Sequence, residues 1–104
     1  MVKVTYYIGM NDKNTLKQEL AKCDFITEFD KVFRDYTVYE AQGRFTNRLG
    51  EITFERTLIV TTFIDECTKA TLRQHVQHNC SILKNKLNQE SILVEVTRPE
   101  VMFL

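Results

Sequence analysis

The chain has 104 residues, a mass of 12.3 kDa, and 14 basic residues balanced by 14 acidic ones. This length suits one domain, which we expect to span residues 1–104. Generic nucleic-acid binding needs a basic excess, and the balanced charge argues against it. The apolar runs are too short to span a membrane, and the N-terminus lacks the pattern of a signal peptide. We therefore expect a cytoplasmic protein.

The cysteines and histidines do not predict a metal or cofactor site. Cys23, Cys67 and Cys80 show no CxxC spacing, which favours three reduced and mostly buried thiols over a disulfide framework or a structural zinc. His75 and His78 have a spacing that two metal ligands can use. Cys80, however, falls in the apolar stripe of the same predicted helix, so the three side chains do not converge on one ion.

Residues 2–8 alternate with a period of two and predict the first strand, whose core-facing members are Val2, Val4, Tyr6 and Ile8. A polar loop follows over residues 9–14. We expect two helical pieces between residues 14 and 34. Asp12 or Asn14 caps the first piece, which carries Leu16 and Leu20, and Asp24 caps the second.

Residues 36–46 and 51–63 predict a hairpin of two long strands joined by a turn over residues 47–50. The most uniform apolar face results when Phe45 pairs with Ile52 and Gly43 pairs with Phe54. In that register Arg56 points into the apolar face opposite Ala41. A slip of one residue sets apolar against polar side chains, so we expect this register.

Asp65 is the predicted cap of a long helix with one apolar stripe, made by Leu72, Val76, Cys80, Leu83 and Leu87. Residues 91–97 predict the last strand, which Pro99 ends. The apolar residues 101–104 then cap the core, add a short strand, or pack on a neighbour.

The element order β-α-β-β-α-β predicts an α+β, ferredoxin-like sandwich, with an antiparallel sheet and helices on one face. The other sheet face stays open. Folds of this kind commonly use that face for assembly or ligands, and we expect a homo-oligomer.

Short motifs carry a family resemblance. Tyr6-Tyr7-Ile8-Gly9, Ala41-Gln42-Gly43, Glu55-Arg56-Thr57-Leu58 and Gln89-Glu90-Ser91-Ile92-Leu93 resemble those of a family of small bacterial domains of unknown function. This resemblance implies a ferredoxin-like fold and no established activity. A more distant similarity is to nitrogen-regulatory PII-like trimers, which bind nucleotides between subunits. Those proteins have a long loop where this chain has only a short connection between its second and third strands.

The candidate binding residues are three arginines and two tyrosines: Arg44, Arg48, Arg56, Tyr7 and Tyr39. Guanidinium groups bind phosphates in a bidentate way and aromatic rings stack on bases, so these residues predict a cleft for an anionic ligand, for example a nucleotide. A structural ion pair of Arg56 with an acidic residue is the alternative. Glu40 and Glu55 are expected on the open sheet face, with Arg44 close to Glu55.

No catalytic residues stand out from this sequence, because neither serine lies in a nucleophile elbow. The sequence therefore predicts a non-catalytic oligomeric module that binds a small anionic ligand or a protein partner. One alternative is a small inhibitor, of the kind that phages encode, that blocks a larger protein or sequesters a signal molecule. The other alternative is a small dimeric ferredoxin-like enzyme.

Overall fold

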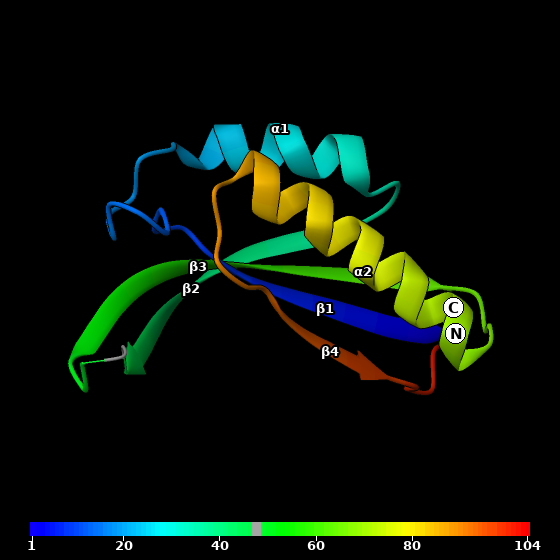
Figure 1. Cartoon of the computed structure of the whole chain (residues 1–104). Helices are drawn as coiled ribbons and strands as arrows, with labels where there is room; N and C mark the ends of the chain where they lie inside the picture. Colours follow the sequence, from blue (N-terminus) through cyan, green and yellow to red (C-terminus); the bar gives the residue numbers. More distant parts are fainter. Residues whose placement is uncertain (47–48) are drawn as a thin grey trace.

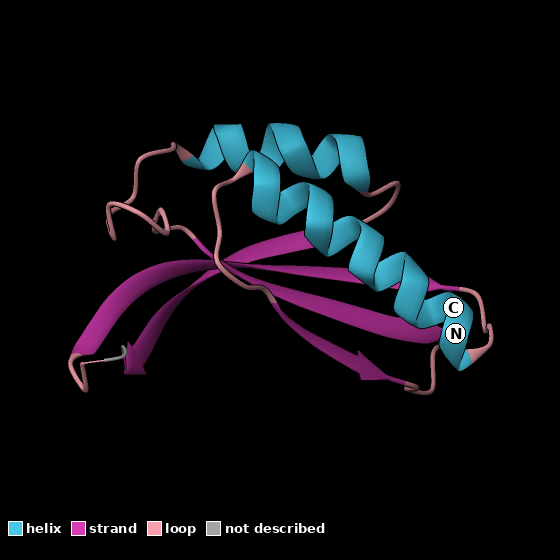
Figure 2. Cartoon of the chain, in the orientation of Figure 1, coloured by secondary structure: helices cyan, strands magenta, loops and turns pink. Residues whose placement is uncertain are grey.

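The computed structural model describes residues 1–46 and 49–104. Its elements follow in the order β1 (Val2–Gly9), α1 (Lys22–Val32), β2 (Thr37–Thr46), β3 (Ile52–Ile64), α2 (Lys69–Lys86) and β4 (Leu93–Thr97), as Figure 1 shows. The four strands make one sheet in the order β2-β3-β1-β4, and all neighbours are antiparallel. Both helices lie on the same side of the sheet (Figure 2). The α+β class and the antiparallel sheet with helices on one face are confirmed.

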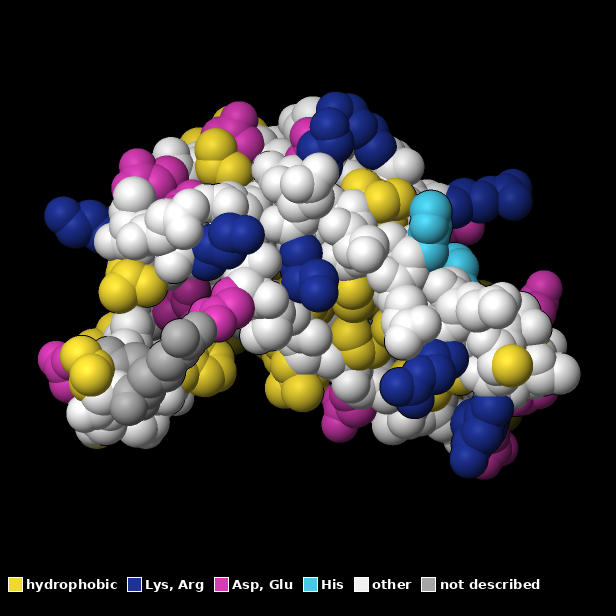
Figure 3. All heavy atoms as spheres, in the orientation of Figure 1, with side chains coloured by type: hydrophobic (Ala, Val, Ile, Leu, Met, Phe, Trp, Pro, Cys, Tyr) yellow, Lys and Arg dark blue, Asp and Glu magenta, His cyan; other side chains and the backbone are white. Residues whose placement is uncertain are grey.

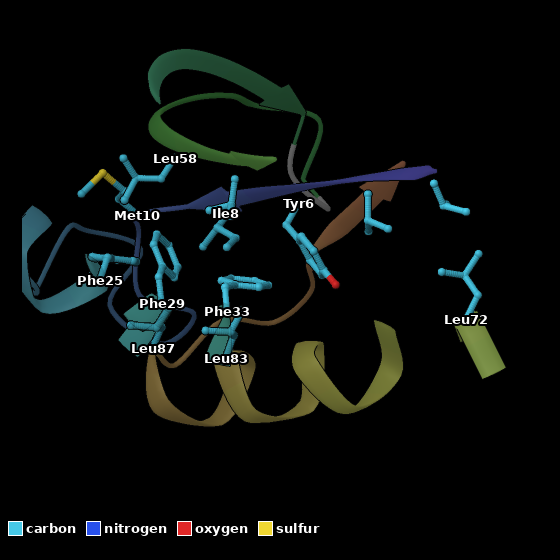
Figure 4. Packing of buried hydrophobic residues seen from close by; sticks show 13 residues of the cluster. Tyr6, Ile8, Met10, Phe25, Phe29, Phe33, Leu58, Leu72, Leu83 and Leu87 are labelled. Carbon is cyan, nitrogen blue, oxygen red and sulfur yellow. The ribbon is translucent and has the colours of Figure 1, made fainter. Parts of the chain in front are cut away.

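The core lies between the helices and the sheet face that they cover. Val2, Val4, Tyr6 and Ile8 of β1 have no exposed surface, as their alternation predicts. Phe25 and Phe29 of α1 and Leu83 of α2 meet them from the helix layer (Figure 4). The same core cluster includes Met10, Phe33, Leu58, Val60, Leu72 and Leu87. The predicted stripe of α2 is confirmed, since Val76 and Cys80 pack against this cluster.

The register of the β2–β3 hairpin differs from the prediction by one residue. Phe45 pairs with Thr53, Gly43 with Glu55, and Gln42 with Arg56. The predicted pairing rested on the outer half of the hairpin, which extends beyond the helices and leaves apolar side chains exposed on both faces. Burial therefore does not select the register there. The inner half selects it, because Val38 pairs with Val60 on the side that the helices cover.

A single helix, not two, precedes β2. Asp12 Oδ1 accepts bonds from the backbone N–H groups of Asn14 (2.8 Å) and Thr15 (3.2 Å), which closes a local turn in place of a helical one. Leu16 then adopts φ +61°, which a right-handed helix cannot continue. Asp24 does support the start of α1, because its carboxylate accepts a bond from the backbone N–H of Ala21 at 2.9 Å.

Helix α2 begins three residues later than predicted. Its N-cap is Thr68, whose hydroxyl accepts a bond from the backbone N–H of Thr71 at 3.2 Å, and Asp65 lies outside the helix. The helix ends with Asn88 at φ +51°, and the N–H of Gln89 donates to the carbonyl of Lys84 at 3.0 Å. This Schellman motif turns the chain toward β4. Neither helix is long and apolar enough to cross a membrane.

Candidate functional site

The structure does not bring the five predicted binding residues together. Tyr7 and Tyr39 lie on the open face of the sheet, where both are register neighbours of Ile59. Arg44 and Arg56 are each an odd number of residues along their strand from Tyr39 and Ile59, so they lie on the opposite face of the hairpin. Arg48 falls outside the described residues. The predicted grouping of arginines with both tyrosines therefore does not form among the residues that the structure describes.

Arg56 makes an ion pair at the surface instead of entering an apolar face. Its Nη2 donates to Glu40 Oε1 at 2.6 Å and its Nη1 donates to Gln18 Oε1 at 3.1 Å. The hydrogen bond from Arg56 holds the pKa of Glu40 below its usual value. This is the structural pairing that the sequence left open as an alternative. Arg56 lies on the same face of β3 as Leu58 and Val60, but its side chain is 49% exposed.

The other hairpin charges also lie differently from the prediction. Glu40 pairs with Leu58, and Leu58 is three residues along β3 from Glu55. Glu40 and Glu55 therefore lie on opposite faces of the hairpin. The Arg44 guanidinium carbon lies 4.9 Å from the centre of the Phe54 ring, a cation–π contact on the face away from Glu55. Only Glu55 therefore faces the open side.

A cavity of about 590 Å³ lies on the open sheet face, where the hairpin curves away from the other strands. Figure 3 shows the molecule hollowed beside the hairpin. Its floor comes from β1, β2 and β3 and its walls from the segments before α1 and after α2. The lining includes Tyr7, Gly9, Asn11, Asp12, Lys13, Leu16, Gly43, Phe45, Glu55, Thr57, Ile59, Glu90 and Leu93.

Two loops far apart in sequence are joined to form the polar wall of this cavity. Asn88 Nδ2 donates to Asp12 Oδ2 at 2.6 Å, and the backbone N–H of Lys13 donates to the Asn88 carbonyl at 3.0 Å. Gln89 Nε2 donates to the Asn11 carbonyl at 2.8 Å. The bond from Asn88 above all, with those from the backbone N–H groups of Asn14 and Thr15, holds the pKa of Asp12 below its usual value, so this carboxylate is ionised at neutral pH.

Glu55 presents a half-buried carboxylate at the floor of the cavity. Its side chain lies across Gly9, where a Cβ atom would collide with the carboxyl group. Its Oε2 accepts a bond from the backbone N–H of Asn11 at 2.9 Å. Burial raises the pKa of Glu55, and the bond from Asn11 opposes this only in part. Glycine at position 9 thus makes the room in which an acidic side chain is partly withdrawn from water.

Thr57 carries a buried polar atom with no partner. Its residue is 5% exposed, and its Oγ1 accepts and donates no hydrogen bond among the described residues. The Phe45 ring lies over Gly43, at a place that a Cβ atom would fill, and that place is 3.0 Å from Thr57 Oγ1. The hydroxyl and the ring are therefore neighbours on the cavity floor. Buried polar groups nearly always have a partner, so this hydroxyl is unusual.

Tyr7 is the predicted binding residue that lines the cavity. Its hydroxyl donates to Glu95 Oε1 at 3.1 Å, and this bond raises the pKa of the phenol. The bond holds the ring beside Ile59 and Leu93, which lie opposite Tyr7 on the neighbouring strands. The cavity thus has apolar and aromatic walls as well as polar ones.

The charge of the cavity favours a cationic ligand over the predicted anionic one. Its described lining includes the carboxylates of Asp12, Glu55 and Glu90, with Lys13 as the one basic side chain, and no arginine. No group of three or more metal-ligating side chains occurs among residues 1–46 and 49–104. The sequence predicted Glu55 on the open face, in an ion pair with Arg44. Its contact with Gly9, 46 residues earlier, could not be predicted, because it depends on β1 and β3 being neighbours in the sheet.

No family model matches the sequence, and no curated protein matches it. Among solved structures, the chain is similar to a phage SAM lyase in its apo state, with a TM-score of 0.75 and 17% identity over 92% of this chain and 78% of that one. It is also similar to a phage SAM lyase in complex with S-methyl-5'-thioadenosine, with a TM-score of 0.68 and 19% identity over 92% and 79% of the two chains.

These likenesses establish a shared fold. They also overturn the prediction of a non-catalytic binding module, because both of these solved structures are of an enzyme. The comparisons do not bear on the resemblance to small bacterial domains or to PII-like proteins, which stays a prediction.

Proposed function

We propose that this chain is a small lyase that cleaves S-adenosylmethionine and releases S-methyl-5'-thioadenosine, and that the cavity on the open sheet face is its active site. The observation that carries the proposal is the half-buried carboxylate of Glu55 in an acidic cavity, on a fold shared with a phage SAM lyase over 92% of the chain. S-adenosylmethionine is a sulfonium cation with an adenosine group, and the cavity offers groups that suit both parts.

The carboxylates of the cavity suit the positive charge of the sulfonium group. Asp12 and Glu55 face the cavity, and a carboxylate in a partly dehydrated site attracts a cation more strongly than the same group in water does. The rings of Tyr7 and Phe45 offer flat faces on which an adenine stacks or a sulfonium rests. The orphan Thr57 hydroxyl gains a partner when a substrate with polar groups enters.

The apolar lining favours the bond-breaking step itself. When the bond between the sulfur and the γ-carbon of the methionyl group breaks, the sulfur keeps the electron pair and becomes a neutral thioether. The γ-carbon receives an electron pair from the carboxylate of the same substrate, which closes a lactone and needs no water. The positive charge of the sulfonium and the negative charge of the attacking carboxylate cancel in this step, so walls such as Ile59 and Leu93 that exclude water favour the less polar transition state over the substrate.

The direct test is to incubate the purified chain with S-adenosylmethionine and to measure S-methyl-5'-thioadenosine and the lactone by mass spectrometry. Glu55→Gln should raise KM for the cationic substrate but leave inhibition by the neutral product S-methyl-5'-thioadenosine nearly unchanged. Glu40→Gln is the matched control, since Glu40 lies on the opposite face of the same hairpin. The proposal fails if the chain neither cleaves nor binds S-adenosylmethionine, or if both variants behave alike.

We further assign the sheet to the ferredoxin-like topology. The order β2-β3-β1-β4, with both crossover helices on one face, supports this assignment because it follows from two interleaved β-α-β units. The handedness of the two β-α-β crossovers tests the assignment, because both should be right-handed. Left-handed crossovers would contradict it.

A further inference from the structure

A second hollow lies on the helix side of the sheet, between α2 and the edge strand β4. This groove has a volume of about 560 Å³ and is lined by Lys69, Leu72, Arg73, Val76, Gln77, Val94 and Val96. Figure 3 shows hydrophobic side chains between α2 and β4, next to Lys and Arg side chains. Val96 is 39% exposed, so the floor of the groove is apolar surface in contact with water. It lies on the opposite side of the sheet from the cavity proposed as the active site.

The charges along the groove have one sign. Lys69 and Arg73 lie four residues apart on α2, and the lining contains no acidic side chain. Among residues 1–46 and 49–104, neither cation has a carboxylate within ion-pair distance. An occupant with one acidic side chain therefore complements this groove better than a basic occupant does.

Strand β4 offers backbone groups to the same occupant. It is the last strand in the order β2-β3-β1-β4 and, among residues 1–46 and 49–104, pairs with β1 alone, so its other edge offers N–H and C=O groups for pairing. An extended peptide that pairs with this edge would place alternate side chains over Val94 and Val96. The groove and the edge together suit an extended, apolar segment.

The chain itself contains a segment of this kind. Residues 98–104 form no helix or strand. Met102 is 68% exposed, Phe103 is 88% exposed, and Leu104 is fully exposed. Glu100 precedes them, is exposed, and makes no ion pair in the described part of the chain. Three consecutive large apolar side chains in water mark a segment that gains stability when a surface covers them.

We propose that residues 99–104 dock in the α2–β4 groove of a second copy of this chain, with Phe103 over the apolar floor and Glu100 beside Lys69 and Arg73. A two-residue turn does not fold the same segment back onto its own β4. A two-residue hairpin turn needs positive φ at one or both central residues, which here would be Arg98 and Pro99. Proline fixes φ near −65°, and arginine disfavours positive φ.

The area available is that of a specific interface. An aromatic side chain buries roughly 150–250 Å². Two reciprocal segments, each covering a groove with Phe103 and two aliphatic neighbours, therefore reach about 1,200 Å² in total when both surfaces are counted. This self-association depends on a surface away from the proposed active site, so it stands whether or not the chain cleaves S-adenosylmethionine.

The test is the mass of the full chain in solution, measured by light scattering and sedimentation over a wide range of concentration. We expect an oligomer that Phe103→Asp dissociates. Ile52→Asp is the matched control, because Ile52 is 65% exposed but lies on the β2–β3 hairpin, and this variant should stay associated. Glu100→Lys should weaken association severalfold, and the added change Lys69→Glu should restore it.

Three results overturn the proposal. One is a wild-type chain that is monomeric at every concentration. If Phe103→Asp also lowers the Tm of that monomer, the segment docks on its own chain. The second is an oligomer that Phe103→Asp leaves intact. The third is dissociation by Ile52→Asp alone, which would assign the interface to the hairpin. Circular dichroism spectra of all variants establish that each one is folded.

Discussion

Replacing Thr57 with valine should stabilise the protein, which is the opposite of what most core substitutions do. Thr57 is 5% exposed and its hydroxyl has no hydrogen-bond partner in the described residues. A buried polar group left without a partner costs about 1–3 kcal/mol, and valine has the same shape without that group. A gain of this size corresponds to a rise in Tm of about 4–8 °C per kcal/mol for a domain of nearly this length.

Thr62 provides the matched control on the same strand. It is 7% exposed, but its hydroxyl donates to the Val4 carbonyl at 3.3 Å. Thr62→Val loses this bond and should therefore lower the free energy of unfolding by about 0.5–1.5 kcal/mol. Urea unfolding followed by circular dichroism measures both variants, with equal m-values as the condition for comparison. If Thr57→Val is destabilised as much as Thr62→Val, the Thr57 hydroxyl has a partner in solution and the reasoning is wrong.

The same substitution separates stability from function. If the Thr57 hydroxyl serves the proposed substrate, Thr57→Val should raise KM for S-adenosylmethionine while it raises Tm. Thr62→Val faces the core and should change Tm alone. A Thr57→Val enzyme that is both more stable and equally active would remove Thr57 from the site.

Three further substitutions have definite expected outcomes. Burial raises the pKa of Glu55 above its usual 4.5, so its contribution to stability is complete below that pH and is lost as pH rises through the raised pKa. Glu55→Gln should therefore raise the free energy of unfolding relative to wild type at pH 7 and not at pH 4. An equal change in the free energy of unfolding at both pH values would contradict the buried position of Glu55. Leu16→Gly should add about 0.5–1 kcal/mol, because the strain of a left-handed leucine exceeds the entropic cost of glycine, whereas Leu16→Ala keeps the strain and should not gain. Arg56→Met should leave turnover of S-adenosylmethionine unchanged, since Arg56 pairs with Glu40 on the face away from the cavity; a loss of turnover would return Arg56 to the site.

The parts of the fold that burial determines were predictable from the sequence. The alternation in β1 and the stripe in α2 each place most apolar side chains on one face, and the core covers both of these faces. The register of the outer hairpin was predicted wrongly because burial does not determine it. Its apolar side chains are exposed on both faces, so the pattern of Phe45, Ile52 and Phe54 contains no information about which residue pairs with which.

The candidate site was predictable only in part, because its key contacts join residues that no local pattern relates. Tyr7 was identified by its aromatic ring, and the arginines were grouped with it by their chemistry alone, although Arg44 and Arg56 lie on the opposite face of the sheet. Glu55 meets Gly9 because β1 and β3 are neighbours in the sheet, and the Asp12 loop meets Asn88 because a Schellman motif turns the chain there. These contacts depend on strand order and on two left-handed residues, and neither feature has a periodic signal.

Three locally unfavourable features converge on one cavity, and this gives a reason for placing function there that does not depend on any similar structure. Leu16 has a left-handed backbone, Thr57 has an orphan hydroxyl, and Glu55 has a carboxylate partly removed from water. Each feature alone has a simple replacement that the fold would accept with a gain in stability. Local rules are broken mainly where a site needs them broken. The cavity, and not the surface arginines, is therefore where substitutions should raise stability and lower activity together.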